Sequence, residues 1–175
     1  IVFNTQQPKN IDLIKKKFHN KKITIVISSA INNKNKELNY CLDHHLTIKH
    51  RSEILSLIMK SFKSIAVAGS HGKTSTSTFL TTLIDLCTKD TSSIIGGIIP
   101  QYESNSIIKD STYLIAEIDE SDGTNSNYNP YLGIINNIDF DHCDYYLNIN
   151  ELIKSIYQFG SNSNILLTND DCEVS

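Results

Sequence analysis

The chain of 175 residues contains no tryptophan, only three prolines and only seven glycines. So little proline and glycine excludes collagen-like and low-complexity chains, in which these residues dominate the composition. The hydrophobic content of 39% is too high for a disordered chain. A chain of this length buries roughly two thirds of the surface that it exposes when unfolded. The sequence therefore predicts a globular protein with a sizeable core.

Long apolar runs and an excess of positive charge are also missing. No apolar stretch approaches the roughly 18 residues that span a bilayer, and the start IVFNTQQPKN lacks the layout of a signal peptide. A net charge of -3 argues against broad electrostatic binding to nucleic acid or to anionic membranes. We therefore expect a soluble, cytoplasmic protein that binds neither nucleic acid nor membrane.

The four cysteines, Cys41, Cys87, Cys143 and Cys172, form no CxxC pair. This scatter indicates neither a zinc site nor a disulfide scaffold, so we expect reduced thiols. The chain starts at Ile1 without a methionine and ends in DDCEVS. We interpret it as a fragment of a longer protein.

Apolar runs rich in isoleucine and valine alternate with segments of helical spacing. The runs predict strands at 23–27, 65–68, 113–118, 131–135 and 165–167. The spacing predicts helices at 9–18, 36–44, 51–60, 74–87 and 150–159, the last one ended by Gly160 at its C-cap. This order predicts an α/β fold with a mostly parallel sheet, helices on both faces and ligands at the carboxyl edge.

The predicted helix at 74–87 is crowded with threonine and serine, which are poor helix formers. We expect it to be stabilised by burial of one apolar face, formed by Phe79, Leu80, Leu83, Ile84 and Cys87. A bound phosphate would stabilise its first turn.

Residues 65–78, IAVAGSHGKTSTST, have the strand, glycine-bearing turn and helix of a phosphate-binding loop. Backbone N–H groups at the helix start favour an anion, Lys73 can reach the β and γ phosphates, and the Thr74 hydroxyl can bind magnesium. The first glycine is Gly69, whereas the common GxxxxGK[ST] spacing would place it at Val67. The alternative is a glycine turn with a purely structural role.

Two acidic clusters follow later strands. In STYLIAEIDESDG, residues 111–123, the alternation of strand side chains puts Glu117 and Asp119 on one face near the carboxyl edge, where a magnesium ion beside the loop needs a ligand. In YLGIINNIDFDHCDYY, residues 131–146, His142 lies among aspartates and can bind a divalent ion. The structural alternatives are an acidic loop that caps the next helix and an ordinary surface histidine.

The three segments AGSHGKTSTST, LIAEIDESD and INNIDFDHCDYY, in this order, resemble the Mur ligases, the ATP-dependent amide-forming enzymes of peptidoglycan precursor synthesis. ITIVISSAIN at 23–32 and KHRSEIL at 49–55 add to the resemblance. It implies that residues 1–60 are the later part of a Rossmann-like UDP-sugar-binding domain. Residues 61–175 would then be the N-terminal part of the central P-loop ATPase domain. The third, amino-acid-binding domain would be absent.

By resemblance, Lys73 is the phosphate-binding lysine and Thr74 a magnesium ligand. Glu117 would bind the magnesium that bridges the β and γ phosphates, and His142 a second magnesium. The nucleotide-binding set implied by the resemblance is Gly69, Ser70, His71, Gly72, Lys73, Thr74, Ser75 and Asn137.

The resemblance is greatest to the branch that uses ATP and Mg²⁺ to join L-alanine to the lactyl carboxylate of UDP-N-acetylmuramate through an acyl phosphate. One alternative is the related ligase that recycles murein tripeptide onto UDP-N-acetylmuramate. The other is a non-catalytic P-loop module that only binds a nucleotide. Because the third domain is absent, the resemblance implies no ligase turnover by the fragment alone.

Overall fold

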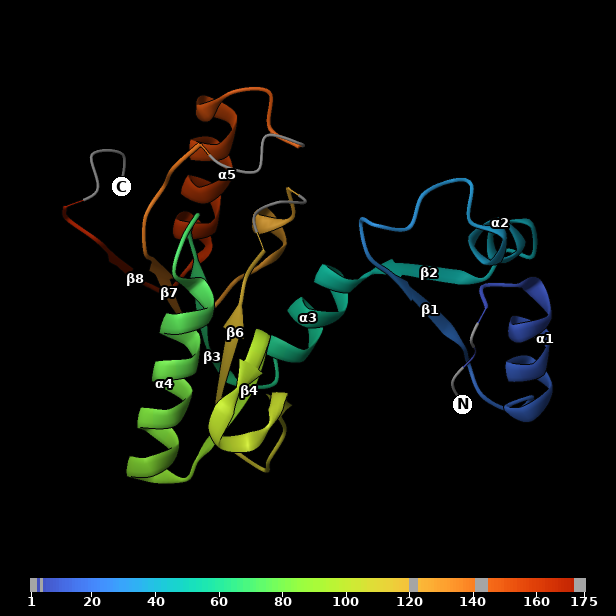
Figure 1. The fold of residues 1–175 in the computed structure, drawn as a ribbon, viewed down its shortest axis with the longest axis horizontal. Coiled ribbons are helices and arrows are strands. Elements are labelled where there is room, and N and C mark those ends of the chain that lie inside the picture. The colour runs from blue at the N-terminus through green and yellow to red at the C-terminus, as the bar shows by residue number, and fades with distance from the viewer. Residues whose placement is uncertain (1–2, 4, 120–122, 141–144, 172–175) are drawn as a thin grey trace. The chain divides into compact units, whose positions relative to one another are not determined.

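The computed structural model describes residues 3, 5–119, 123–140 and 145–171 (Figure 1). The chain forms two compact units, Ile1–Ile54 and Leu55–Ser175. The functional boundary expected at residue 60 stays a prediction. Within the described ranges, no helix combines the length and apolar character needed to cross a membrane. Of the four cysteines, Cys41 and Cys87 are described, and both are free thiols.

The first unit contains a two-stranded parallel sheet with helices. In chain order it consists of α1 (Pro8–Lys17), β1 (Thr24–Ile27), α2 (Lys36–Asp43), β2 (Thr47–His50) and the start of α3 (Arg51–Met59). Pro8 opens α1, where its missing N–H costs nothing, and the Asn35 side chain caps α2 by accepting from the Leu38 N–H at 3.0 Å. The short strand β2 is not among the predicted strands because its sequence, TIKH, is half polar.

The second unit is built on a six-stranded sheet in the order β5-β4-β6-β3-β7-β8 (Figure 1). Its strands are β3 (Lys63–Ala68), β4 (Thr91–Ile99), β5 (Ser104–Ile107), β6 (Tyr113–Glu117), β7 (Leu132–Ile135) and β8 (Ile165–Thr168). Only the β4–β5 hairpin, joined by the short helix η1 (Pro100–Tyr102), pairs antiparallel. The predicted α/β fold with a mostly parallel sheet is confirmed.

The central strand β3 brings the three predicted site segments together. Val67 of β3 lies opposite Glu117 of β6 on one side and opposite Ile134 of β7 on the other. The carboxyl ends of β3, β6 and β7 therefore meet at one edge of the sheet. This is the edge where open α/β sheets bind their ligands.

Two helices cover opposite faces of this sheet. Helix α4 (Lys73–Thr88) links β3 to β4, whereas α5 (Ile149–Asn162) links β7 to β8 in the opposite direction across the sheet, so right-handed crossovers place them on different faces. Leu80 and Ile84 of α4 pack on a cluster around Val67. Phe159 and its neighbours on α5 pack on the larger cluster that contains Ala66.

The predicted buried face of α4 is partly wrong. Leu80 and Ile84 do pack on the core, but Phe79 is 66% exposed, and Leu83 and Cys87 are also exposed. The fully buried residues are Ser77 and Thr81. The small side chains of Ser77 and Thr81 let the helix lie close to the sheet, and the Thr81 hydroxyl is satisfied within the helix by the Ser77 carbonyl at 2.8 Å.

The predicted helix end at Gly160 is also wrong. Helix α5 continues to Asn162, and Ser163 is its C-cap. A Cβ atom at position 160 would lie 3.1 Å from Leu166 Cδ2 of β8. Gly160 therefore provides close contact between helix and strand instead of a turn.

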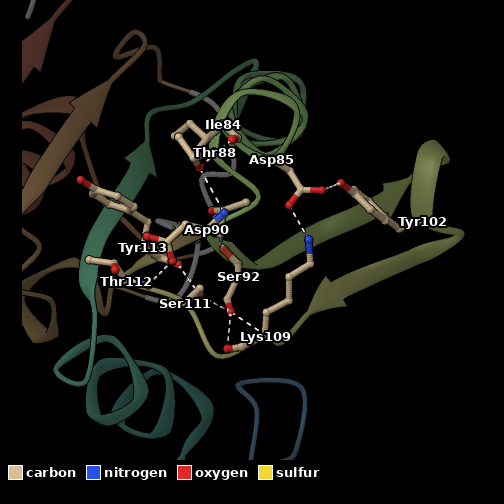
Figure 2. A network of polar contacts seen from close by, with 11 residues as sticks. Ile84, Asp85, Thr88, Asp90, Ser92, Tyr102, Lys109, Ser111, Thr112 and Tyr113 are labelled. Carbon is tan, nitrogen blue, oxygen red and sulfur yellow. Dashed lines mark hydrogen bonds and ion pairs between the residues drawn. The ribbon is translucent and has the colours of Figure 1, made fainter.

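A polar network fixes the β4–β5 hairpin to α4 (Figure 2). The Asp85 carboxylate of α4 accepts hydrogen bonds from the Lys109 ammonium and from the Tyr102 hydroxyl of η1. The hydrogen bond from Lys109, followed by that from Tyr102, lowers the pKa of Asp85. Burial, followed by the hydrogen bond to Asp85, raises the pKa of Tyr102 to about 12.

Candidate functional site

The loop between β3 and α4 depends on two glycines. Gly69 and Gly72 have φ angles of 123° and 76°, a region that residues with a Cβ atom rarely adopt. A Cβ atom at position 69 would also lie 2.8 Å from the carbonyl oxygen of Asn137. The absence of a Cβ atom at Gly69 thus lets the loop lie directly against Asn137, just after β7.

Hydrogen bonds tie this loop to the segment after β7. The Ser70 N–H donates to the Asn137 carbonyl at 3.1 Å, and the His71 N–H donates to Asn137 Oδ1 at 2.8 Å. The Ser70 hydroxyl donates to the Asp139 carbonyl at 2.7 Å and accepts from the Asp139 N–H at 2.8 Å. Asn136 Nδ2 donates to Thr76 Oγ1 of α4 at 3.0 Å. Asn137 therefore shapes the loop through its backbone and its side chain.

Lys73, the first residue of α4, extends back over the loop. Its Nζ donates to the carbonyl oxygens of Gly69 at 2.7 Å and Ser70 at 3.3 Å. The ammonium thus lies at the same end of the helix as the first N–H groups of α4. A cation and a helix N-terminus together favour a bound anion such as a phosphate group.

Thr74 and Glu117, two of the predicted metal ligands, lie next to each other. The Thr74 hydroxyl donates to Glu117 Oε1 at 2.9 Å, and the Gly96 N–H donates to Glu117 Oε2 at 2.7 Å. A carboxylate and a hydroxyl are hard oxygen donors of the kind that Mg²⁺ prefers, so these residues fit a magnesium ion beside the loop. His142, the third predicted ligand, lies outside the described residues.

The other predicted binding residues line the loop or the start of α4. Gly69 and Ser70 are buried, whereas His71 and Gly72 are exposed. His71 Nε2 lies 3.5 Å from an Asp139 carboxylate oxygen. Ser75 is exposed and faces the β4 side, where it lines a shallow groove with Ile98.

A groove of about 590 Å³ begins at the loop and runs between α4 and the end of β7. Gly72 and Asn136 form its polar end, and Phe79, Leu80 and Leu167 contribute apolar walls. Mostly apolar walls with a few polar groups are typical of small-molecule sites. Its volume lies within the range of about 300–1,000 Å³ that such sites have.

Two features of the structure are absent from the sequence predictions. Gly96 and Gly97 of β4 contact Glu117 and Thr74, and the signal that could have revealed them is a glycine pair inside an apolar run, IIGGII.

In the first unit, His50 has polar partners at the strand ends, with Nε2 3.1 Å from Ser29 Oγ and Nδ1 2.8 Å from Ser52 Oγ.

Two family models match almost the whole chain. Residues 67–175 match the Mur ligase middle domain, and residues 1–63 match the model described as the Mur ligase family, catalytic domain. The first match alone covers more than half of the chain.

Individual relatives agree with the family models. A UDP-N-acetylmuramate--L-alanine ligase of Prochlorococcus marinus subsp. pastoris is 58% identical over all 175 residues, which span 37% of its own length. A crystal structure of UDP-N-acetylmuramate-alanine ligase MurC from Thermotoga maritima superimposes with a TM-score of 0.80 at 22% identity, over 87% of this chain and 36% of that one.

A second solved structure has the same fold. The UDP-N-acetylmuramate:L-alanyl-gamma-D-glutamyl-meso-diaminopimelate ligase from Neisseria meningitides superimposes with a TM-score of 0.87 at 18% identity, over 99% of this chain and 58% of that one. At such identities the two superpositions establish the fold alone. With the two matching models and the identity to the Prochlorococcus enzyme, they lead to one conclusion: the chain belongs to the Mur ligase family.

Proposed function

We propose that the protein to which this chain belongs is an ATP-dependent ligase that joins L-alanine to the lactyl carboxylate of UDP-N-acetylmuramate. The reaction would be a cytoplasmic step of peptidoglycan precursor synthesis. The observation that carries the choice of substrates is the 58% identity, across the entire chain, to a relative of that name. The choice of ATP is supported by the glycine loop, Lys73 and the adjacent Thr74–Glu117 pair.

In the proposed reaction the γ-phosphoryl group moves from ATP to the lactyl carboxylate and forms an acyl phosphate. The amine of L-alanine then attacks the acyl carbon, and phosphate leaves through a tetrahedral intermediate. Such phosphoryl transfer depends on positioning and charge neutralisation more than on covalent help from the protein. Lys73 and the N–H groups at the start of α4 would orient the phosphates and neutralise their charge.

Magnesium fits the same site. Thr74 and Glu117 would hold the ion, with His142 as a ligand of a second one, and the bound ion would supply positive charge at the phosphate oxygens. Glu117 is fixed at both carboxylate oxygens by hydrogen bonds, so its position is set by the protein before any ligand binds.

The two parts of the chain would divide the substrates. We propose that residues 1–60 belong to the domain that binds the UDP-sugar and that residues 61–175 belong to the domain that binds ATP. The chain spans only 37% of the length of the Prochlorococcus relative. Selection of the amino acid is therefore assigned to the rest of the protein.

The test is phosphate release by the full-length protein with ATP, Mg²⁺ and UDP-N-acetylmuramate. L-alanine should support release, and Lys73→Ala should abolish it. Release with murein tripeptide in place of L-alanine would instead identify the recycling ligase, the activity class of the Neisseria structure. ATP binding without release under either condition would favour a non-catalytic nucleotide-binding module.

A further inference from the structure

The glycine pair of β4 lies beside the Thr74–Glu117 pair, and neither glycine is required by a positive φ angle. Among the described glycines, only Gly69, Gly72 and Gly123 have positive φ angles, so Gly96 and Gly97 adopt backbone conformations open to other residues. Glycine in a strand is unfavourable because it loses more entropy on folding and adds no packing. We attribute the two glycines to the close approach of neighbouring side chains, which leaves no room for a Cβ atom at these positions.

That space is filled by the two site residues. A Cβ atom at position 97 would lie 2.6 Å from Thr74 Cγ2. A Cβ atom at position 96 would lie 3.0 Å from Glu117 Oε1 and 3.1 Å from Oε2. The distance at position 97 is far shorter than an ordinary contact between carbon atoms, which is about 3.5–4.0 Å. The distances at position 96 are tighter than most contacts that a Cβ atom makes, so the carboxylate would have to shift by a few tenths of an ångström. A larger residue at position 97 would displace the Thr74 side chain, and one at position 96 would press against the Glu117 carboxylate.

The strand also supplies a hydrogen bond at this point. The paired positions of β4 and β6 end with Ile94 opposite Ala116, and the register of β4 against β5 shifts between Ile94 and Ile99. The Gly96 N–H lies in this irregular stretch and donates to Glu117 Oε2 at 2.7 Å. The break in regular pairing thus directs a backbone donor at the carboxylate.

We propose that Gly96 and Gly97 are positioning residues for the metal ligands of this site. Gly96 holds one carboxylate oxygen of Glu117, and Gly97 leaves room for Thr74 to reach the other oxygen. The inference rests on the proposed function, since it concerns the same magnesium and nucleotide site. It assigns a role to a strand outside the three motifs that identify the family.

The decisive variant is Gly97→Ala, tested alone and with Thr74→Ser. The methyl group at position 97 would collide with Thr74 Cγ2, and serine lacks that atom while it keeps the hydroxyl. The next nearest Thr74 atom, Cβ, is 4.0 Å away, an ordinary contact. The double variant should therefore bind an ATP analogue in Mg²⁺ as tightly as Thr74→Ser alone does. Gly97→Ala alone should bind the analogue more weakly in Mg²⁺.

The readout is the binding of a non-hydrolysable ATP analogue to the full-length protein, by calorimetry, in Mg²⁺ and in EDTA. For Gly97→Ala we expect the ratio of the two affinities to fall about tenfold or more, the usual effect of losing a residue that orients metal ligands. The affinity in EDTA should not change. Gly160→Ala is the matched control, because its methyl group would meet only the ends of two apolar side chains outside the site, Leu166 at 3.1 Å and Ile135 at 3.7 Å.

An unchanged affinity ratio in Gly97→Ala would overturn the inference, and so would a loss that Thr74→Ser does not recover. If Gly97→Ala fails to fold, Gly96→Ala provides the test, because its methyl group would meet only the terminal carboxylate of Glu117, at 3.0 Å, and no backbone atom. A normal affinity ratio in Gly96→Ala would also overturn the inference. A wild-type protein that binds the analogue with Mg²⁺ but releases no phosphate would contradict the proposed function and leave the positioning role standing.

Discussion

Lys73 donates hydrogen bonds to the carbonyl oxygens of Gly69 and Ser70. Its ammonium is therefore held over the loop by the protein itself, at the end of α4 where the helix N–H groups also face outward. The sequence predicted Thr74 and Glu117 as magnesium ligands, because a GKT tripeptide and an acid at a strand end are local patterns, and the structure brings the two side chains within hydrogen-bond distance. Their role as metal ligands stays a prediction. The glycines that fix them could not be predicted, because their role depends on which strand lies next to β6.

For Lys73→Ala we expect the affinity for ATP to fall between about tenfold and a hundredfold. The expectation follows from the roughly 1.5–3 kcal/mol that a hydrogen bond to a charged group contributes. Calorimetry with the full-length protein measures the change. Lys73→Arg keeps the charge but replaces a compact ammonium with a planar group, so it should recover only part of the affinity. An alanine variant that binds ATP as tightly as the wild type would contradict this role.

At the scale of single elements, helix α5 begins with an N-cap at Asn148. Asn148 Oδ1 accepts from the Glu151 N–H at 3.2 Å, and Glu151 Oε2 accepts from the Leu147 N–H at 3.0 Å. Asn148→Ala should lower the free energy of unfolding by about 1 kcal/mol, since it removes the side-chain cap and leaves the Glu151 N–H with only the backbone carbonyl of residue 148, at 3.2 Å. Asn148→Asp, which keeps the acceptor, should cost much less. Chemical denaturation of both variants makes the comparison.

The Asp85 network makes the stability of the β4–β5 hairpin depend on pH. Because the pKa of folded Asp85 lies below its unfolded value, the carboxylate stabilises the fold at pH values above that unfolded value, near 4. This contribution is lost as the pH falls through the folded pKa. Asp85, only 12% exposed, is the acceptor for both Lys109 and Tyr102.

Asp85→Asn should therefore destabilise the protein at pH 7, by about 1.5–3 kcal/mol, and less at pH 3, which lies below the unfolded pKa. Denaturation at the two pH values, monitored through exchange of the β4 amides, gives the difference. Lys109→Met tests the same contact from its other side. Equal effects of Asp85→Asn at both pH values would show that the charge contributes nothing.

The sheet shows which elements a sequence reveals. Strands β1, β3, β6, β7 and β8 were predicted because each contains an uninterrupted apolar run. Strands β2, β4 and β5 were not. Thr91, Ser92 and Ser93 of β4 are fully buried, and their burial depends on the neighbouring α4 and hairpin rather than on their own polarity. The error at Gly160 has the same origin, since glycine at a close contact and glycine at a helix end have the same local signal.

At the scale of the whole molecule, the 175 residues alone should form no amide bond. They span 37% of the length of the Prochlorococcus relative, and the resemblance assigns amino-acid binding to the remainder. Mass spectrometry for UDP-N-acetylmuramoyl-alanine, after incubation with all substrates, measures turnover. The full-length protein, assayed in parallel, is the positive control. Product made by residues 1–175 alone would contradict the assignment of amino-acid binding to the rest of the protein.

The contacts of Ser70 and His71 with Asn137 and Asp139 have a wider consequence. Two stretches almost seventy residues apart in the chain are each other's hydrogen-bond partners, so a change in the backbone of either removes partners from the other. Engineering the phosphate loop, by lengthening it to the commoner spacing for example, would require redesign of the turn after β7 as well. Transplanting the loop into another scaffold would likewise fail unless that turn were moved with it.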